Sequence, residues 1–179
     1  MLEEVVNTYG KLMYLKVWVD SCDDELYLKY VDVVESHNAN ILHNDFIDAG
    51  FDLLNAVDCT VSREKVNKID YKVVCSAKMI EKSGVSYNTG FYMYPRSSIS
   101  KSHLRLANNV GIIDAGYRGH LIGMFDVVYA SEAYLAKGER HLQICAPGLV
   151  PIYVELVKSK EALGEETTRG EGGFGSTGK

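Results

Sequence analysis

The feature that most limits the fold of this chain is a series of short apolar runs after Gly50. Each run has the length of a β-strand and is bounded by Gly, Asn, Asp, Ser or Pro, which are turn residues. The runs are DCTVS, IDYKVVCSAKMI, VSYNTGFYMY, NVGIID, HLIGMFDVVYA, ERHLQICA and VPIYVELVK. Strands repeated at this spacing predict an all-β sandwich, barrel or jelly roll.

The segment before Gly50 has a different pattern. Met13–Val19 (MYLKVWV) is a β-branched and aromatic run, which predicts a strand. A helical insertion is predicted next, at about residues 21–45, because one helical face would carry Leu26, Tyr30, Val33 and Val34. The stretch ELYLKYVDVV would also suit a strand. Shorter helical pieces are predicted in SSISKSHLRL and SEAYLAKGE.

Length, charge and cysteine usage narrow the class of protein. The 179 residues predict one domain over residues 1–168. The net charge of −5, without a block of Lys or Arg, argues against nucleic-acid binding, and no apolar run reaches the roughly 20 residues of a membrane helix. Without a signal-peptide pattern, and with four scattered cysteines, the chain is expected to be soluble and intracellular, in the cytoplasm or nucleus.

Polar residues of functional types follow several of the predicted strands. Arg96, Ser97 and Ser98 come directly after Pro95, and a guanidinium beside hydroxyls and backbone N–H groups suits an anion. Taken one at a time, such stretches are usually structural, since an Asp in a turn is most often a turn residue. The other stretches are DAGFDLLNA, NNVGIIDAGYRG, GERHLQ and the glycine-rich end RGEGGFGSTGK.

In this order the stretches resemble the five motifs of the homotrimeric, all-β dUTP pyrophosphatase (dUTPase) family. The resemblance extends from about Ile47 to the end of the sequence. It implies a distorted antiparallel β-barrel or jelly roll with one or two short helices. The matching residues are Ala49, Gly50, Asp52 and Leu53; Pro95 to Ser98; Gly111, Ile113, Asp114, Tyr117, Arg118 and Gly119; Gly138, Arg140 and Gln143; and Arg169 to Gly178.

The resemblance implies hydrolysis of dUTP to dUMP and pyrophosphate, which limits uracil in DNA and supplies dUMP for dTMP synthesis. Asp114 would hold and deprotonate the water that attacks the α-phosphorus. Tyr117 would pack under the deoxyribose and exclude a 2′-hydroxyl. The uracil edge would be read by Asn108 and by the strand residues Gly111, Ile112 and Ile113.

The same resemblance implies how the triphosphate is held. Arg96, Ser97, Ser98 and Gln143 would bind the phosphates. Mg²⁺ would be the cofactor, with Asp52 accepting hydrogen bonds from its waters instead of binding it directly. Arg140 suits either a phosphate contact or an ion pair between strands or subunits, and Arg118 is open in the same way.

The glycine-rich end, residues 169–179, is expected to act as a lid over nucleotide bound to a neighbouring subunit. Glycines allow close approach to phosphate oxygens, and Phe174 offers a flat face to the base. The remaining lid residues assigned to substrate are Arg169, Gly175, Ser176 and Thr177. The resemblance therefore implies a homotrimer whose sites are shared between subunits.

Two alternative functions, and one difference from the compact members of the family, remain to be described. The N-terminal segment is longer than compact family members need, which is typical of decorated viral forms, and it would pack on the barrel or against a partner. A dCTP deaminase would need an Arg within the stretch after Ser98, where ISKSH has none, and a Glu after the third motif, where HLIGMFD has none. A nucleotide-responsive regulatory trimer is the other alternative. His103, His120 and His141 lack the spacing of metal ligands and are predicted to be surface or strand residues.

Overall fold

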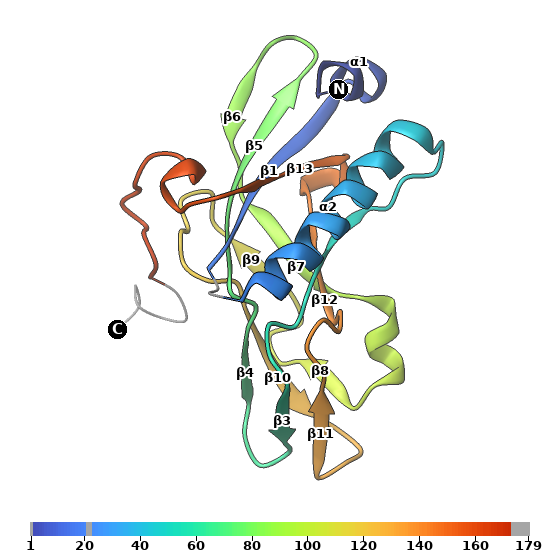
Figure 1. Cartoon of the computed structure of the whole chain (residues 1–179), viewed down its shortest axis with the longest axis vertical. Coiled ribbons are helices and arrows are strands. Elements are labelled where there is room, and N and C mark those ends of the chain that lie inside the picture. Colours follow the sequence, from blue (N-terminus) through green and yellow to red (C-terminus); the bar gives the residue numbers. More distant parts are fainter. Residues whose placement is uncertain (1, 21–22, 173–179) are drawn as a thin grey trace.

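The computed structural model describes residues 2–20 and 23–172, and most of its regular elements are β-strands (Figure 1). Over those residues the strands form four sheets, accompanied by two α-helices and three short 3₁₀ helices. The predicted all-β class is confirmed. The sheets are distorted, and within the described ranges they do not join into one closed barrel.

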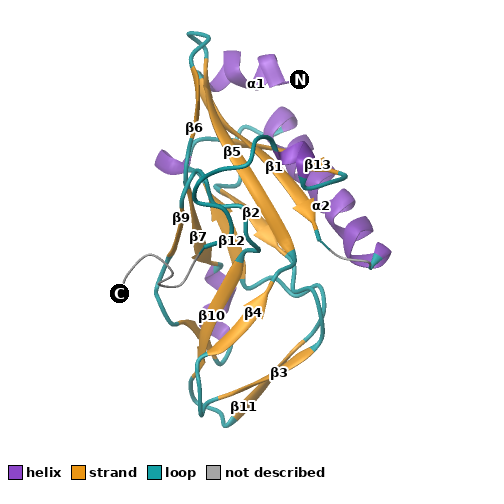
Figure 2. Cartoon of the chain, turned by 90° about the vertical axis from the view of Figure 1, so that its left-hand side faces the viewer, coloured by secondary structure: helices purple, strands orange, loops and turns teal. Residues whose placement is uncertain are grey.

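The first sheet occupies the upper half of the molecule (Figure 2). Its strands, in spatial order, are β13 (Ile152–Val157), β1 (Lys11–Val19), β5 (Val73–Glu81) and β6 (Ser86–Asn88). The strand predicted at Met13–Val19 is thus present as β1. It pairs antiparallel with β5 but parallel with β13, so the sheet is not purely antiparallel.

The second sheet carries most of the sequence motifs. Its strands, in order, are β2 (Gly50–Leu53), β12 (Leu142–Cys145), β7 (Phe91–Pro95) and β9 (Gly111–Ile113), all antiparallel. Along β2 and β12, buried residues alternate with polar ones, so that Phe51 and Ile144 face the core while Asp52 and Gln143 face away from it. The polar motif residues Asp52 and Gln143 therefore share the face of this sheet that points away from the core.

The lower half contains two smaller sheets (Figure 1). One has β4 (Asn67–Asp70), β10 (Ile122–Val127) and β8 (Leu104–Leu106), and the other pairs β11 (Glu132–Leu135) with β3 (Cys59–Ser62). The prediction of a helical turn in SEAYLAKGE is wrong, because this stretch forms β11. The helix predicted after Pro95 is present as η1 (Ser97–Lys101), and η2 (Pro147–Leu149) and η3 (Glu161–Leu163) flank β13.

Two α-helices precede the motif-bearing strands. α1 covers Leu2–Tyr9, and α2 covers Asp24–His43, within the segment predicted as a helical insertion. Asp23 caps α2 by accepting a hydrogen bond from the Glu25 N–H at 3.0 Å. The strand alternative for this stretch is wrong. At 20 residues α2 fills most of the predicted segment.

Helix α2 lies across the sheets and packs into the main core (Figure 1). Leu26 and Tyr30 are fully buried there. Near the other end of the helix, the Asn38 amide exchanges two hydrogen bonds with the backbone of Val154 on β13, at 2.8 and 3.0 Å. The His37 ring lies 2.8 Å from the Ile152 carbonyl oxygen. The helix is therefore fastened both to the core and to β13.

Membrane insertion through a helix has no structural counterpart in the described part of the chain. Neither α1 nor α2 has the combination of length and apolar character that crossing a bilayer requires.

Candidate active site

Asp52 is the centre of the first group of motif residues. It lies opposite Gln143 in the pairing of β2 with β12, and Gln143 lies opposite Tyr94 on β7. The Arg96 Nε is 2.7 Å from Asp52 Oδ1, and the Arg140 Nη1 is 3.1 Å from Asp52 Oδ2. With only 17% of its side chain exposed, Asp52 has both carboxylate oxygens engaged by guanidinium groups. Two cations therefore share one carboxylate at the edge of the sheet.

A glycine is required beside this cluster. A Cβ on Gly50 would lie 2.3 Å from Gln143 Oε1 and 2.9 Å from its Cδ, because the Gln143 side chain crosses the Gly50 backbone. Gln143 Nε2 also donates to the Pro95 carbonyl at 3.4 Å. The glycine therefore makes room for the amide group that the sequence assigns to phosphate binding.

Arg140 forms one of the two contacts that the sequence left open for it. The sequence allowed either a phosphate contact or an ion pair, and the structure has the ion pair, formed within the chain. Arg96 pairs with the other oxygen of the same carboxylate. Arg96 and Arg140 thus share one counterion.

Ser97 and Ser98 begin the 3₁₀ helix η1 directly after Arg96, and both are exposed. The Arg96 backbone N–H donates to the His141 carbonyl at 2.9 Å, which ties this turn to the segment leading into β12. The two residues are therefore open to solvent directly after Arg96.

The second group of motif residues surrounds a hollow of about 190 Å³ beside β9. The motif residues that line it are Asn108, Gly111, Ile112, Ile113, Asp114, Tyr117 and Arg169, together with Met93, His120, Ile122 and Gly172. Residues of the first group, such as Asp52 and Gln143, are not part of this lining. The chain thus divides the predicted site residues between the two sides of β7.

Strand β9 forms the wall of the hollow. Gly111 is buried against β7, where a Cβ would lie 3.1 Å from the Met93 Cβ. Ile112, between Gly111 and Ile113 in this strand, is 72% exposed. Asn108 is exposed in the turn that leads into β9, and Asn109 in that turn has a positive φ of 62°.

Asp114 lies at the end of β9, with 59% of its side chain exposed. Its Oδ2 is 3.1 Å from the Arg169 Nε. The sequence assigned Arg169 to the substrate, and here its guanidinium lies beside the Asp114 carboxylate of its own chain. The Asp114 carboxylate is therefore accessible to solvent, as a general base must be.

The Tyr117 ring folds back over its own turn. Its hydroxyl donates to the His120 carbonyl at 2.9 Å, and a Cβ on Gly119 would lie 2.5 Å from that hydroxyl oxygen. Partial burial, and then the charge of Glu171, raise the pKa of the Tyr117 phenol. Gly119 is therefore the residue that lets the aromatic ring lie flat against the backbone.

The first residues of the predicted lid pack against this same turn. Thr167 Oγ1 donates to the Gly116 carbonyl, Gly170 forms a parallel bridge with Tyr117, and the Arg118 N–H donates to the Gly170 carbonyl at 2.8 Å. A side chain on Gly116 would press on Arg169 and Thr167. The substrate-binding assignments to Phe174, Gly175, Ser176 and Thr177 lie outside the described residues.

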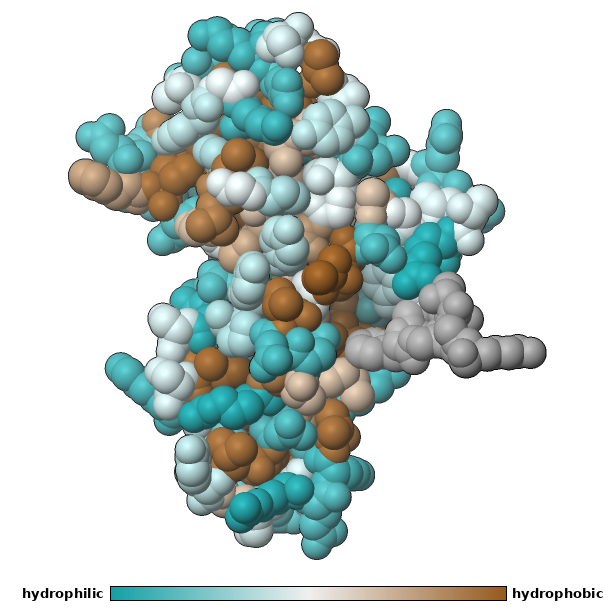
Figure 3. Space-filling model, turned by 180° about the vertical axis from the view of Figure 1, so that it is seen from behind, coloured by the Kyte–Doolittle hydropathy of each residue, from teal (hydrophilic) through white to brown (hydrophobic). Residues whose placement is uncertain are grey.

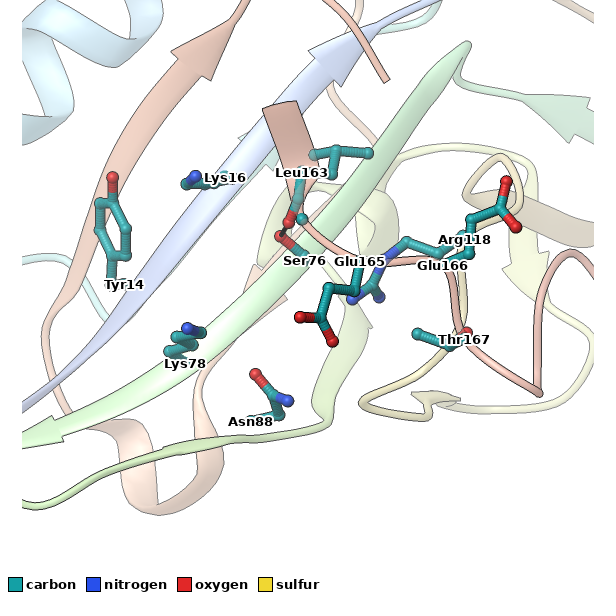
Figure 4. A pocket seen from close by; sticks show the side chains of 11 residues that line it. Tyr14, Lys16, Ser76, Lys78, Asn88, Arg118, Leu163, Glu165, Glu166 and Thr167 are labelled. Atoms are coloured by element: carbon teal, nitrogen blue, oxygen red, sulfur yellow. Dashed lines mark hydrogen bonds between the residues drawn. The ribbon is translucent and has the colours of Figure 1, made fainter. Parts of the chain in front are cut away.

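Arg118 faces away from the hollow that holds Asp114. It lines a larger hollow of about 440 Å³ between β1, β5, β6 and residues 163–167, where Lys16 and Lys78 also point (Figure 4). Its Nη1 donates to the carbonyls of Ala115 and Tyr117, at 3.0 and 2.9 Å, and burial lowers the pKa of its guanidinium. The contacts of Arg118 are therefore structural.

Sequence reasoning missed one cluster beside the hollow. The His120 ring lies between two carboxylates, with Nδ1 2.9 Å from Asp70 Oδ2 and Nε2 2.9 Å from Asp20 Oδ2. No local pattern could have indicated it, because the partners are 50 and 100 residues away in the sequence. His103 is exposed and His141 is partly buried, as predicted for surface or strand residues.

These observations define the class: an all-β protein whose candidate site is divided between the two sides of one central strand. Comparison with known proteins gives the family. The family model described as dUTPase matches residues 39–178, more than half of the chain, and the chain therefore belongs to the dUTPase family. Residues 1–38 precede this match.

Individual relatives agree with the family match. The deoxyuridine 5′-triphosphate nucleotidohydrolase of Clostridium kluyveri is 33% identical over 132 residues, covering 73% of this chain and 84% of that protein. The enzyme of the same name from Corynebacterium jeikeium is 35% identical, covering 73% and 80%. The one from Escherichia phage T5 is 45% identical over 85 residues, covering 47% and 55%.

Proposed function

We propose that this protein hydrolyses dUTP to dUMP and pyrophosphate. The observation that carries the proposal is the hollow beside β9, where Asp114, Tyr117 and the strand backbone meet in a chain of the dUTPase family. Removing dUTP limits the incorporation of uracil into DNA, and the dUMP formed supplies dTMP synthesis. Relatives that match over four fifths of their length carry the name of this activity.

In the proposed reaction, water attacks the α-phosphorus in line with the bond to the leaving group. The Asp114 carboxylate orients that water and takes its proton, while the bond from the α-phosphorus to the bridging oxygen breaks and pyrophosphate leaves. The exposure of Asp114 at the end of β9 gives a water molecule access to its oxygens.

The same hollow accounts for recognition of the nucleoside. The Tyr117 ring forms a flat floor for the deoxyribose, on which a ribose 2′-hydroxyl would clash. Asn108 and the backbone of Gly111, Ile112 and Ile113 face the uracil edge. Backbone groups matched to uracil O4 reject the cytosine amine, and a tight turn before β9 leaves no room for a 5-methyl group.

The cluster around Asp52 holds the triphosphate. Arg96, the exposed hydroxyls of Ser97 and Ser98, and the amide of Gln143 donate to phosphate oxygens. Asp52 offsets one of the two positive charges of Arg96 and Arg140 before substrate arrives, so both guanidiniums are held in position and one net positive charge remains for the phosphates.

Mg²⁺ is the proposed cofactor, and the residues present fit an indirect role for Asp52. Both Asp52 oxygens already accept from arginines, so they suit hydrogen bonds to metal-bound waters better than direct coordination. In the described ranges no group of three His, Cys, Asp or Glu residues could hold a metal ion, which fits a cation carried on phosphates and water. Bound Mg²⁺ supplies charge neutralisation of the triphosphate.

A homotrimer is part of the proposal, since the residues assigned to one reaction lie in two groups. One subunit would supply Asp52, Arg96 and Gln143, a second the hollow with Asp114, and a third the lid of residues 169–179. Apolar patches on the surface favour association (Figure 3), and exposed apolar side chains include Phe46, Ile112 and Tyr129. The trimer is proposed to act inside the cell, in the cytoplasm or nucleus, with Cys59, Cys75 and Cys145 as free thiols.

The test is pyrophosphate release from dUTP, UTP, dCTP and dTTP, with and without Mg²⁺. We expect release from dUTP alone, and we expect Asp114→Asn to lower kcat by roughly 10²–10⁴-fold while it still binds a non-hydrolysable dUTP analogue. Asp126→Asn is the matched control, because Asp126 is an exposed carboxylate on β10 and should leave the rate unchanged. Ammonia release from dCTP, or a near-native rate for Asp114→Asn, would contradict the proposal.

A further inference from the structure

The His120 imidazole joins three parts of the chain beside the candidate site. Its Nε2 contacts Asp20, directly after β1, and its Nδ1 contacts Asp70, the last residue of β4, both at 2.9 Å. The His120 side chain is only 24% exposed. The ring is thus clamped between the ends of two strands that belong to different sheets.

The chemistry of this contact restricts the ring. Each of its two nitrogens lies within hydrogen-bond distance of a different carboxylate, so the ring cannot rotate without losing a contact. Other charged groups surround the pair: Lys72 forms an ion pair with Asp70, and Lys160 forms one with Glu171 near the start of the lid. The Asp20 and Asp70 carboxylates therefore fix the orientation of the His120 ring.

The position of the His120 backbone in turn restricts the Tyr117 side chain. The Tyr117 hydroxyl donates to the His120 carbonyl at 2.9 Å, and the ring rests on Gly119. Tyr117 also bridges to Gly170 at the root of the lid. The tilt of the aromatic ring, and the place where the lid leaves the body, both depend on where His120 sits.

We propose that His120, held by Asp20 and Asp70, is a positioning residue that sets discrimination against ribonucleotides through Tyr117. This rests on the proposed function, in which the Tyr117 ring excludes the ribose 2′-hydroxyl. A ring with a fixed tilt excludes the hydroxyl by clash, whereas a ring free to move makes room for it. His120 does not need to touch the substrate to have this effect.

The test compares kcat/KM for dUTP and UTP in the wild type, His120→Ala and His120→Gln. We expect the dUTP-to-UTP ratio to fall about tenfold or more in His120→Ala, with UTP turnover rising relative to dUTP. His120→Gln has an amide nitrogen that can donate to one carboxylate. Its dUTP-to-UTP ratio should therefore lie between those of the wild type and His120→Ala. His103→Ala is the matched control, because His103 is an exposed histidine and should leave the ratio unchanged.

A double-mutant cycle with Tyr117→Phe separates positioning from general destabilisation. If His120 acts through the Tyr117 hydroxyl, the double variant should lose no more selectivity than the worse single variant. A purely structural role would lower the melting temperature and both rates together, and would leave the ratio unchanged.

The outcomes are distinguishable. A wild type that does not hydrolyse dUTP refutes the proposed function. A wild type that does so, with His120→Ala and His120→Gln that keep the native selectivity while folded, refutes the role of His120. Fully additive effects of the His120 and Tyr117 substitutions also refute it.

Discussion

At the scale of single residues, Gly50 shows why a motif glycine is needed. The chain places the Gln143 amide directly over the Gly50 backbone, and any side chain there would occupy the same space. The conflict involves the far end of a flexible side chain, so the fold can survive it. The loss would then fall on the group that Gln143 is proposed to hold, the triphosphate.

We therefore predict that Gly50→Ala raises the KM for dUTP about tenfold with a smaller change in kcat, since it removes binding that the ground state and transition state share. Steady-state kinetics beside Gln143→Ala provide the check. Because both changes act on one amide, the double variant should be no weaker than the more affected single variant. A native KM for Gly50→Ala would mean that the amide has room elsewhere.

Residue types and order in the sequence were enough to predict much of the site. Asp52, Arg96 and Gln143 meet in one cluster, and Asp114 and Tyr117 line one hollow. Their placement follows from strand pairing, which puts residues distant in sequence opposite one another. An ion pair of Arg140 was among the roles expected, but its partner Asp52 and the two partners of His120 were not predictable, because ion pairs between strands leave no periodic trace.

At the scale of elements, helix α2 supports the strand that carries Asp52. The Tyr30 hydroxyl, fully buried, accepts a hydrogen bond from the Leu54 N–H at 3.0 Å, directly after β2. Its ring packs near Phe51 of the same strand, with the ring centroids 6.5 Å apart. The helix thus satisfies a backbone donor that would otherwise be buried without a partner.

Tyr30→Phe is predicted to destabilise the fold by about 1–3 kcal/mol, because it leaves the Leu54 N–H buried and unpaired. Tyr71→Phe is the matched control: Tyr71 is equally buried, but its hydroxyl has no hydrogen-bond partner among the described residues. Removing the Tyr71 hydroxyl should leave the free energy of unfolding unchanged or raise it slightly. Chemical denaturation of both variants is the measurement, and equal losses would show that the Tyr30 hydrogen bond is unimportant.

The elements that sequence reasoning misread have physical explanations. The stretch EAYLAK contains good helix formers, but pairing with β3 makes it strand β11, so tertiary contact overrides local preference. α1 was not predicted, since LEEVVNTY is short and has two valines in succession. The parallel pairing of β1 with β13 joins residues more than 130 positions apart and has no sequence signal.

At the scale of the whole molecule, the N-terminal segment is more than an appendage. Residues 1–38 precede the family match, yet β1 lies between β13 and β5 in its sheet. Removing it would expose the edges of both neighbours. The part of the chain outside the matched region is therefore required for the core of the part inside it.

The separation of the two groups of site residues gives the last prediction. If each site needs more than one chain, turnover per chain should fall at least about tenfold as the protein is diluted below the concentration at which the trimer dissociates. Activity measured alongside mass photometry or light scattering is the check, with recovery on reconcentration as the control. A monomeric sample with undiminished turnover would overturn the shared site.

The paired hydrogen bonds between Asn38 and Val154 have a consequence for solubility. The strand at the border of a sheet has unpaired backbone N–H and C=O groups, which can pair with an extended segment of another chain and lead to aggregation. Here a carboxamide from α2 imitates the missing neighbour and occupies both groups of one residue, while His37 occupies the carbonyl of Ile152. These backbone groups of Ile152 and Val154 are therefore unavailable to an incoming strand, which disfavours aggregation along this part of the border.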